Sequence, residues 1–199
     1  MRIIRVELSE KSKGKLRIWL EDGTCFALYR REAGGLSLEP EADLTQEQYR
    51  EIIEDILIPR AKKRAMHLLE QMDRTESQLR DKLKANEYPE PVIDKAVAYM
   101  KDYHYVDDFR YACNYIRYRC QNKSRRQLAC ELYQKGVSKI YVEQALEAEY
   151  PDMDETAKIQ KWLEKKHYDA GTADDRQKQR IYQFLLRRGF RPEDVMKML

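Results

Sequence analysis

Apolar residues recur with one spacing three times between Leu79 and Leu199. The steps between them are four, five, five and four residues each time. The positions are Leu79, Leu83, Tyr88, Ile93 and Val97, then Leu128, Leu132, Val137, Val142 and Leu146, then Ile181, Leu185, Phe190, Val195 and Leu199. A four-residue step keeps side chains on one face of a helix, and a five-residue step across a turn moves the chain to the next helix. Each copy therefore predicts helix, tight turn, helix.

A further amphipathic helix is predicted before each pair, because apolar residues recur on one helical face there as well. The positions are Ala61, Ala65, Leu68, Leu69 and Met72 in the first copy, Phe109, Ala112, Cys113, Ile116 and Cys120 in the second, and Ile159, Trp162 and Leu163 in the third. Three three-helix repeats follow, over residues 60–108, 109–154 and 155–199. Such repeats stack on their neighbours. The expected fold class is therefore mainly α, with three tandem repeats in an elongated curved array.

The amino-terminal segment predicts a small antiparallel β-sheet. Apolar and polar residues alternate in residues 4–8 and 16–21, and residues 24–30 are rich in strand-forming types. Asp22-Gly23, between the last two runs, is typical of a type I′ hairpin turn, in which both central residues need positive φ. With that turn, Trp19 and Phe26 pair on one face of the hairpin. We expect three strands that either pack on the first repeat, which is the preferred interpretation, or contact the partner through Trp19 and Phe26.

A helix is predicted over residues 44–57. Thr45 is a suitable N-cap, and Gln48 stands three residues later, as in a capping box. Pro59 is expected to end or kink this helix. The sheet and this helix together form an extension over residues 1–59.

Polar caps and turn residues punctuate the repeats. Thr75 with Gln78, and Ser124 with Gln127, have capping-box spacing, and Asp174-Asp175 opens the corresponding helix of the third copy. Glycine after the second helix suits a left-handed C-terminal cap. The turn residues are Gly136 and Gly189, with Glu87 in the first copy.

Charge is abundant but nearly balanced, at 37% of residues and a net +3. The carboxy-terminal segment, residues 155–199, holds eleven basic and seven acidic residues, a net +4. Such a gradient suits a polyanion or an acidic protein surface as the partner. The four cysteines form no C-x-x-C pair, and no apolar run has the length of a signal or membrane segment. We expect a cytoplasmic monomer with reduced thiols.

No motif for catalysis is present. The three histidines lack metal-ligand spacing, and there is no phosphate loop, nucleophile elbow or H-E-x-x-H. His104 stands near Asp107 and Asp108, but acidic residues at this point are typical of a helix start, where they satisfy free N–H groups and complement the helix dipole. Cys113 and Cys120 are expected in the core. The sequence therefore predicts a non-enzymatic protein without cofactor or metal.

Two basic clusters are the candidate contact residues. The first contains Arg110, Arg117, Arg119, Lys123, Arg125, Arg126 and Lys135, beside Tyr111, Tyr115 and Tyr118. The second contains Arg176, Lys178, Arg180, Arg187, Arg188 and Arg191. Arginine with adjoining tyrosine can hold phosphates and stack on bases, and both residue types are frequent in protein interfaces. A merely solvated charged face is the alternative.

Several ordered motifs resemble the RecX family of recombination regulators. They are Val106-Asp107-Asp108-Phe109-Arg110-Tyr111-Ala112, Lys123-Ser124-Arg125-Arg126-Gln127-Leu128, Glu131-Leu132 and Gly136-Val137. The family pattern is D-D-x-x-[FY]-A, K-G-x-R-x-[IL] and E-L-x-x-x-G-[IV]. The chain departs from it at Ser124 and Glu87, where glycine is usual, and at Gln127, where a basic residue is common. The resemblance covers residues 60–199, and the amino-terminal sheet is similar to an extension of some members.

The resemblance implies a regulator of recombination, DNA repair and the SOS response. Such a protein binds the RecA recombinase filament on single-stranded DNA, lies along its groove, and limits filament growth, ATP turnover or strand exchange. It also implies weak, sequence-independent binding to single-stranded or duplex DNA. Asp107, Asp108 and Gly136 are then signature positions with structural roles, and Arg125 and Arg126 are the expected contacts.

Two other functions are compatible with the sequence. The segment from Leu132 to Val142 approximates a helix-turn-helix, whose second helix would read duplex DNA. A small residue is usual four positions before the turn glycine of that motif, but Leu132 and Leu185 stand there, so packing repeats are preferred. A generic helical scaffold for an acidic partner is the third hypothesis.

Overall fold

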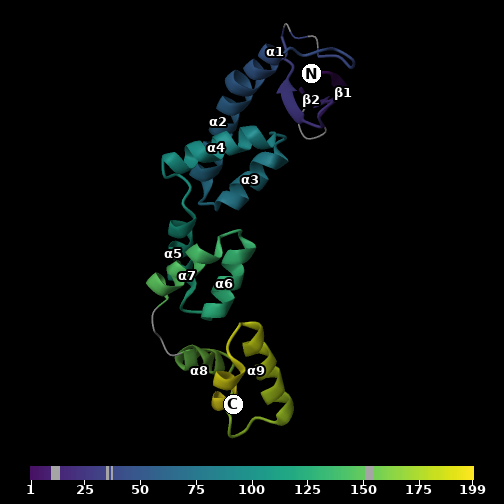
Figure 1. Cartoon of the computed structure of the whole chain (residues 1–199). Helices are drawn as coiled ribbons and strands as arrows, with labels where there is room; N and C mark the ends of the chain where they lie inside the picture. The colour runs from purple at the N-terminus through teal and green to yellow at the C-terminus, as the bar shows by residue number, and fades with distance from the viewer. Residues whose placement is uncertain (10–13, 35, 37, 151–154) are drawn as a thin grey trace. The chain divides into compact units, whose positions relative to one another are not determined.

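The structure is a computed structural model that describes residues 1–9, 14–34, 36, 38–150 and 155–199. These form two compact units, Met1–Asp107 and Asp108–Leu199. Figure 1 shows the small sheet at the amino terminus, with helices along the rest of the chain. The prediction of a mainly helical chain with an amino-terminal three-stranded sheet is confirmed.

The elements follow the predicted order. The first unit contains β1 (Ile3–Leu8), β2 (Lys15–Leu20), β3 (Cys25–Tyr29), α1 (Gln46–Glu51), the π-helix η1 (Ile52–Leu57), α2 (Ile58–Gln71), α3 (Glu76–Ala85) and α4 (Glu90–Asp102). The second contains α5 (Asp108–Arg119), α6 (Arg125–Gln134), α7 (Lys139–Glu149), α8 (Glu155–Lys165), α9 (Asp175–Arg187) and α10 (Pro192–Met198).

The turn of the β2–β3 hairpin differs from the prediction. Leu20 donates its N–H to the Thr24 carbonyl at 2.9 Å, and Gly23 donates to the Leu20 carbonyl at 3.0 Å. Within the loop 21–23, Gly23 alone has positive φ, +83°. The connection is therefore a three-residue loop with a left-handed third residue, and the expected two-residue type I′ turn is wrong.

The longer loop shifts the strand register by one residue. Trp19 pairs with Cys25, and Ile18 pairs with Phe26. Neighbouring residues of a strand point to opposite faces, so Phe26 lies in the core while Trp19 lies on the other face of the sheet. The expected Trp19–Phe26 pair is therefore wrong.

Helix formation begins at Gln46 as predicted but continues past Pro59. The capping box is present, because Gln48 N–H donates to Thr45 Oγ1 at 3.1 Å and Thr45 N–H donates to Gln48 Oε1 at 3.0 Å. Pro59 is the second residue of α2, which follows η1 without a break, so the prediction that Pro59 could end the helix is wrong. The π-helix η1 precedes it, and Ile58 N–H donates to the carbonyl five residues earlier.

The repeated apolar positions form the cores of the three repeats. In the first and second copies all of them are buried. In the third, Leu185, Phe190 and Val195 are buried, whereas Ile181 and Leu199 are half-buried. Phe109 is a correction: expected in the buried stripe of its helix, it is 37% exposed because it stands in the first turn of α5, beside Tyr141.

Five helices end with the same hydrogen-bond pattern. After α6, Gly136 N–H donates to the Tyr133 carbonyl at 2.9 Å and Val137 N–H to the Leu132 carbonyl at 3.1 Å. This is a Schellman cap, which needs one residue in the left-handed region. The left-handed residues are Glu87 (φ 69°), His104 (56°), Gly136 (82°), His167 (51°) and Gly189 (81°).

The predicted N-caps differ in completeness. Thr75 and Gln78 form the full capping box of α3, and Asp174 Oδ1 accepts from Gln177 N–H at 2.6 Å. Ser124 Oγ accepts from Gln127 N–H at 3.1 Å, but the Gln127 side chain donates to Glu131 instead of returning to the cap. The second capping box is therefore only half formed.

The sheet and the first repeat share one hydrophobic core. Phe26 of β3, Leu57 of η1 and Leu79 of α3 belong to the same buried cluster. In the second unit, α5–α7 and α8–α10 each enclose a cluster of their own. The sheet thus packs on the first repeat, as expected.

Candidate partner-binding surface

Three predicted contact residues meet around one tyrosine of α5. The Tyr115 ring lies 4.7 Å from the Arg119 guanidinium and 5.3 Å from Lys135 Nζ, measured to the ring centroid. The Tyr115 hydroxyl donates to Glu131 at 2.7 Å, and Lys123 forms an ion pair with the same carboxylate. Helices α5 and α6 and the loop between them therefore build one linked cluster of aromatic and charged groups.

Contacts within this cluster shift the pKa values of Tyr115 and Glu131. Burial, together with the hydrogen bond to Glu131, raises the pKa of Tyr115 to about 12. Burial also acts to raise the pKa of Glu131, but the hydrogen bonds from Lys123 and Tyr115 outweigh it and hold that pKa below its usual value. At neutral pH the tyrosine is therefore protonated and the carboxylate is charged. Glu131 neutralises much of the charge of Lys123, whose side chain is only 18% exposed.

The outer face of α5 carries Arg110 and Arg117, which are both exposed. Arg117 Nε donates to Glu149 of α7 at 2.9 Å. Tyr118 beside it is 83% exposed. An exposed aromatic ring next to an exposed guanidinium is typical of a surface that binds a partner.

Arg125 and Arg126 are neighbours in sequence but lie in different environments. The Arg125 guanidinium lies 6.0 Å from the Tyr150 ring centroid, and its Nη1 donates to the Leu146 carbonyl at 3.5 Å. Arg126 is exposed and lines a hollow. Both residues are exposed, but Arg125 also contacts Tyr150 and Leu146, whereas Arg126 lines the hollow.

That hollow has a volume of about 350 Å³ and is lined by residues from both basic clusters, which are separate in the sequence. It is lined by Arg126, Gln127, Cys130, Leu186, Arg187, Gly189, Phe190 and Pro192. Ser124 supports it, because its Oγ donates to the Arg188 carbonyl at 2.8 Å. The residue that departs from the family pattern at this position therefore both caps α6 and contacts the third repeat.

The arginines of the second cluster also differ. The Arg188 guanidinium lies 3.7 Å from the Trp162 ring centroid, and burial lowers its pKa. Arg187 and Arg191 are exposed. Arg188 is therefore mostly engaged in packing, and its neighbours carry the accessible charge.

The signature residues occupy structural positions. Asp108 is the first residue of α5, which confirms that the acidic pair opens a helix. Gly136 is the left-handed cap of α6.

No grouping of His, Cys, Asp and Glu suited to a metal ion occurs among the described residues. No described helix has both the length and the apolar character needed to cross a membrane.

Sequence reasoning missed two residues at the end of α8. Lys166 and His167 line a second cavity, together with Arg180 and Arg187 of the predicted cluster. The run of lysine and histidine after Leu163 was the available signal. Within the described part of the third repeat, no side chains form an ion pair, whereas the described residues of the first unit form ten.

Comparison with known proteins decides the family. Models for the first, second and third three-helix domains of RecX match residues 61–100, 107–146 and 153–199. The chain is 33% identical over 200 residues to the regulatory protein RecX of Caldanaerobacter subterraneus subsp. tengcongensis, covering 100% of this chain and 98% of that protein. The chain belongs to the RecX family.

Other RecX proteins agree with this assignment. The regulatory protein RecX of Clostridium tetani is 25% identical over 202 residues, covering 100% of this chain and 93% of that protein. A crystal structure of regulatory protein RecX superposes with a TM-score of 0.63 at 22% identity, covering 98% of this chain and 97% of that one. RecX from Lactobacillus salivarius gives 0.59 at 23% identity, covering 71% and 93%. The solved structures support the fold of repeated three-helix units.

Proposed function

We propose that this protein binds the RecA recombinase filament on single-stranded DNA and limits filament growth, ATP turnover and strand exchange. The observation that carries the proposal is membership of the RecX family across all three repeats. The exposed arginines of the second and third repeats support it. Many weak contacts along a filament add through effective concentration, so such an array needs no single deep site.

The charges of the helices disfavour the alternative of a duplex-reading helix-turn-helix. In that motif, the helix after the turn enters the major groove between two rows of phosphates. The helices in this position are α4, α7 and α10. Helix α4 carries Lys95 and Lys101 but also Glu90, Asp94 and Asp102. Helix α7 carries Lys139 but also Glu143, Glu147 and Glu149. Helix α10 carries Lys197 but also Glu193 and Asp194. Each is net negative, so phosphate would repel it.

The test is the ATP turnover of the cognate recombinase on single-stranded DNA. Protein added at less than one copy per recombinase subunit is expected to lower the turnover and to shorten filaments seen by electron microscopy. Unchanged turnover and filament length at saturating protein would contradict the proposal. A duplex reader would instead select some duplex sites by about 10³-fold or more over others.

Matched variants locate the surface. Arg126→Ala with Arg187→Ala removes two exposed arginines of the hollow, and Arg50→Ala removes an exposed arginine of α1. The double variant is expected to need more protein for the same inhibition, while Arg50→Ala behaves as the parent. Equal effects of both would place the contact elsewhere.

A further inference from the structure

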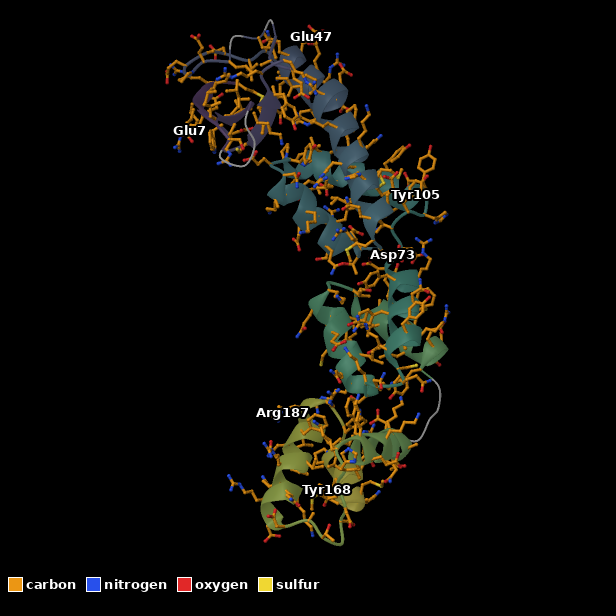
Figure 2. The ribbon with its side chains drawn as sticks, turned by 180° about the vertical axis from the view of Figure 1, so that it is seen from behind. Glu7, Glu47, Asp73, Tyr105, Tyr168 and Arg187 are labelled. Atoms are coloured by element: carbon orange, nitrogen blue, oxygen red, sulfur yellow. The ribbon has the colours of Figure 1, made fainter. Side chains whose placement is uncertain are left out.

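The third repeat contains a cavity of about 660 Å³ between the segment after α8 and the length of α9 from Gln177 to Arg187. It is lined by Lys166, His167, Tyr168, Asp169, Thr172, Gln177, Arg180, Ile181, Phe184 and Arg187. Figure 2 marks Tyr168 and Arg187 on this repeat. We infer that this cavity binds a nucleotide unit, with the phosphate held by the basic side chains and the base against the apolar wall.

The charge of the lining favours an anion. Lys166, Arg180 and Arg187 bring three positive charges, and Asp169 brings the one carboxylate of the lining. Asp169 is engaged locally, because it accepts from Gly171 N–H at 2.9 Å and from the Thr172 hydroxyl at 3.1 Å. No described carboxylate lies within ion-pairing distance of the three cations. Their charge is therefore available to a ligand.

The apolar wall distinguishes a nucleotide from a simple anion. Ile181 and Phe184 stand one helical turn apart on α9, and both line the cavity with Tyr168. Lys166 Nζ lies 4.8 Å from the Phe184 ring centroid, so a cation of the lining adjoins the apolar wall. Aromatic rings stack on bases, and arginine binds phosphate through two parallel hydrogen bonds. The volume is that of a typical small-molecule site.

The spacing of the arginines favours a strand over a single mononucleotide. Arg180 and Arg187 are seven residues apart on α9, about 10 Å along the helix axis. Each guanidinium can therefore hold a different phosphate of one strand. The inference goes beyond the proposed function, because it rests on this cavity and not on any contact with a recombinase.

The test measures binding of the full chain to a fluorescein-labelled oligothymidylate by anisotropy. Arg180→Ala is the test variant. Arg176→Ala is the matched control, since Arg176 lies on the same helix, is exposed and does not line the cavity. Arg180→Ala is expected to weaken binding about ten-fold, as loss of one charge-assisted contact predicts. The slope of log affinity against log salt should fall by about 0.7.

Two further arms identify the ligand. A shift of the NMR signals of α9 by thymidine monophosphate in the parent and not in Arg180→Ala would support the inference and identify a free nucleotide as the ligand. An effect confined to the oligonucleotide would support it with a strand as the source. Equal losses for Arg176→Ala and Arg180→Ala, or equally tight binding of poly-glutamate, would overturn it. The oligonucleotide assay contains no recombinase, so its result does not depend on whether the protein changes recombinase turnover. Each proposal can therefore be contradicted without the other.

Discussion

The Ser9 hydroxyl donates a hydrogen bond to the Glu87 carboxylate at 2.9 Å, across 78 positions of the chain. Arg17 Nε of β2 donates to the same carboxylate at 2.9 Å. Glu87 has a left-handed backbone, at the position that Gly136 and Gly189 fill in the other repeats. In the first repeat, Glu87 therefore stands where glycine would fit the backbone better, and its side chain links the sheet to the helices through hydrogen bonds.

Glu87→Gln is expected to lower the free energy of unfolding of the first unit by about 1–3 kcal/mol, because it leaves a partly buried guanidinium without its counter-charge. The measurement is urea unfolding followed by Trp19 fluorescence in a Trp162→Phe background, since the chain has two tryptophans. Glu54→Gln is the control. It removes an exposed long-range pair with Lys95 and should change stability by less than about 1 kcal/mol. Similar losses for both would contradict the role of Glu87.

The same carboxylate predicts a dependence on acid. Burial acts to raise the pKa of Glu87, but the hydrogen bonds from Arg17 and Ser9 outweigh it and hold that pKa below its usual value. The folded state thus binds this proton less readily than the unfolded state. Its contribution to stability is complete above the unfolded pKa of about 4.3, and it is lost as the pH falls through the lowered pKa. Unfolding between about pH 6 and pH 3 should show a shallower pH dependence in Glu87→Gln than in the parent.

The repeats could be predicted from the sequence because their apolar positions report helical faces directly. The hairpin turn could not, since Asp22-Gly23 suits two loop lengths and only the backbone decides between them. The basic clusters could be located, but their pairing could not. Glu149 lies 32 positions from Arg117, so no local pattern shows which arginines are engaged. The cavity of the third repeat depends on α8 and α9 meeting, which spacing along one helix does not report.

Gly189→Ala is expected to destabilise the second unit more than a left-handed glycine alone would explain. A Cβ at this position would lie 2.6 Å from Ser124 Oγ, which caps α6 and donates to the Arg188 carbonyl. Strain and overlap together predict a loss of about 2–4 kcal/mol. Gly23→Ala has a similar φ and open space around it, so it should cost only about 1–2 kcal/mol. Thermal unfolding of both variants tests this, and equal losses would show that the contact with Ser124 is unimportant.

Arg125→Ala and Arg126→Ala should separate packing from binding. Arg125 packs on Tyr150 and donates to the Leu146 carbonyl, so its loss is expected to cost about 0.5–1.5 kcal/mol. Both residues are exposed, but no such contact is made by Arg126 with the described residues, so its loss should change stability by less than about 0.5 kcal/mol. Melting temperatures and filament binding measured on both variants check this. Weakened binding in Arg125→Ala alone, in proportion to its lost stability, would remove Arg126 from the contact surface.

His167 is expected to lower the stability of the fold through its backbone and to support binding through its side chain. Its backbone is left-handed, φ 51°, in the Schellman cap of α8, while its ring lines the cavity of the third repeat. Glycine adopts this conformation without the steric cost that a side chain incurs. His167→Gly is therefore expected to raise the free energy of unfolding of the second unit by about 0.5–1 kcal/mol, as relief of strain predicts.

The same variant should weaken binding of the labelled oligothymidylate, because one polar group of the cavity is removed. His167→Asn provides the control, since asparagine tolerates the left-handed region and keeps a hydrogen-bonding side chain. Its affinity is expected to lie between those of the parent and His167→Gly. If His167→Gly is more stable and binds the oligonucleotide as tightly as the parent, the imidazole does not contribute to binding in the cavity. A loss of stability would mean that the ring packs more favourably than the strained backbone costs.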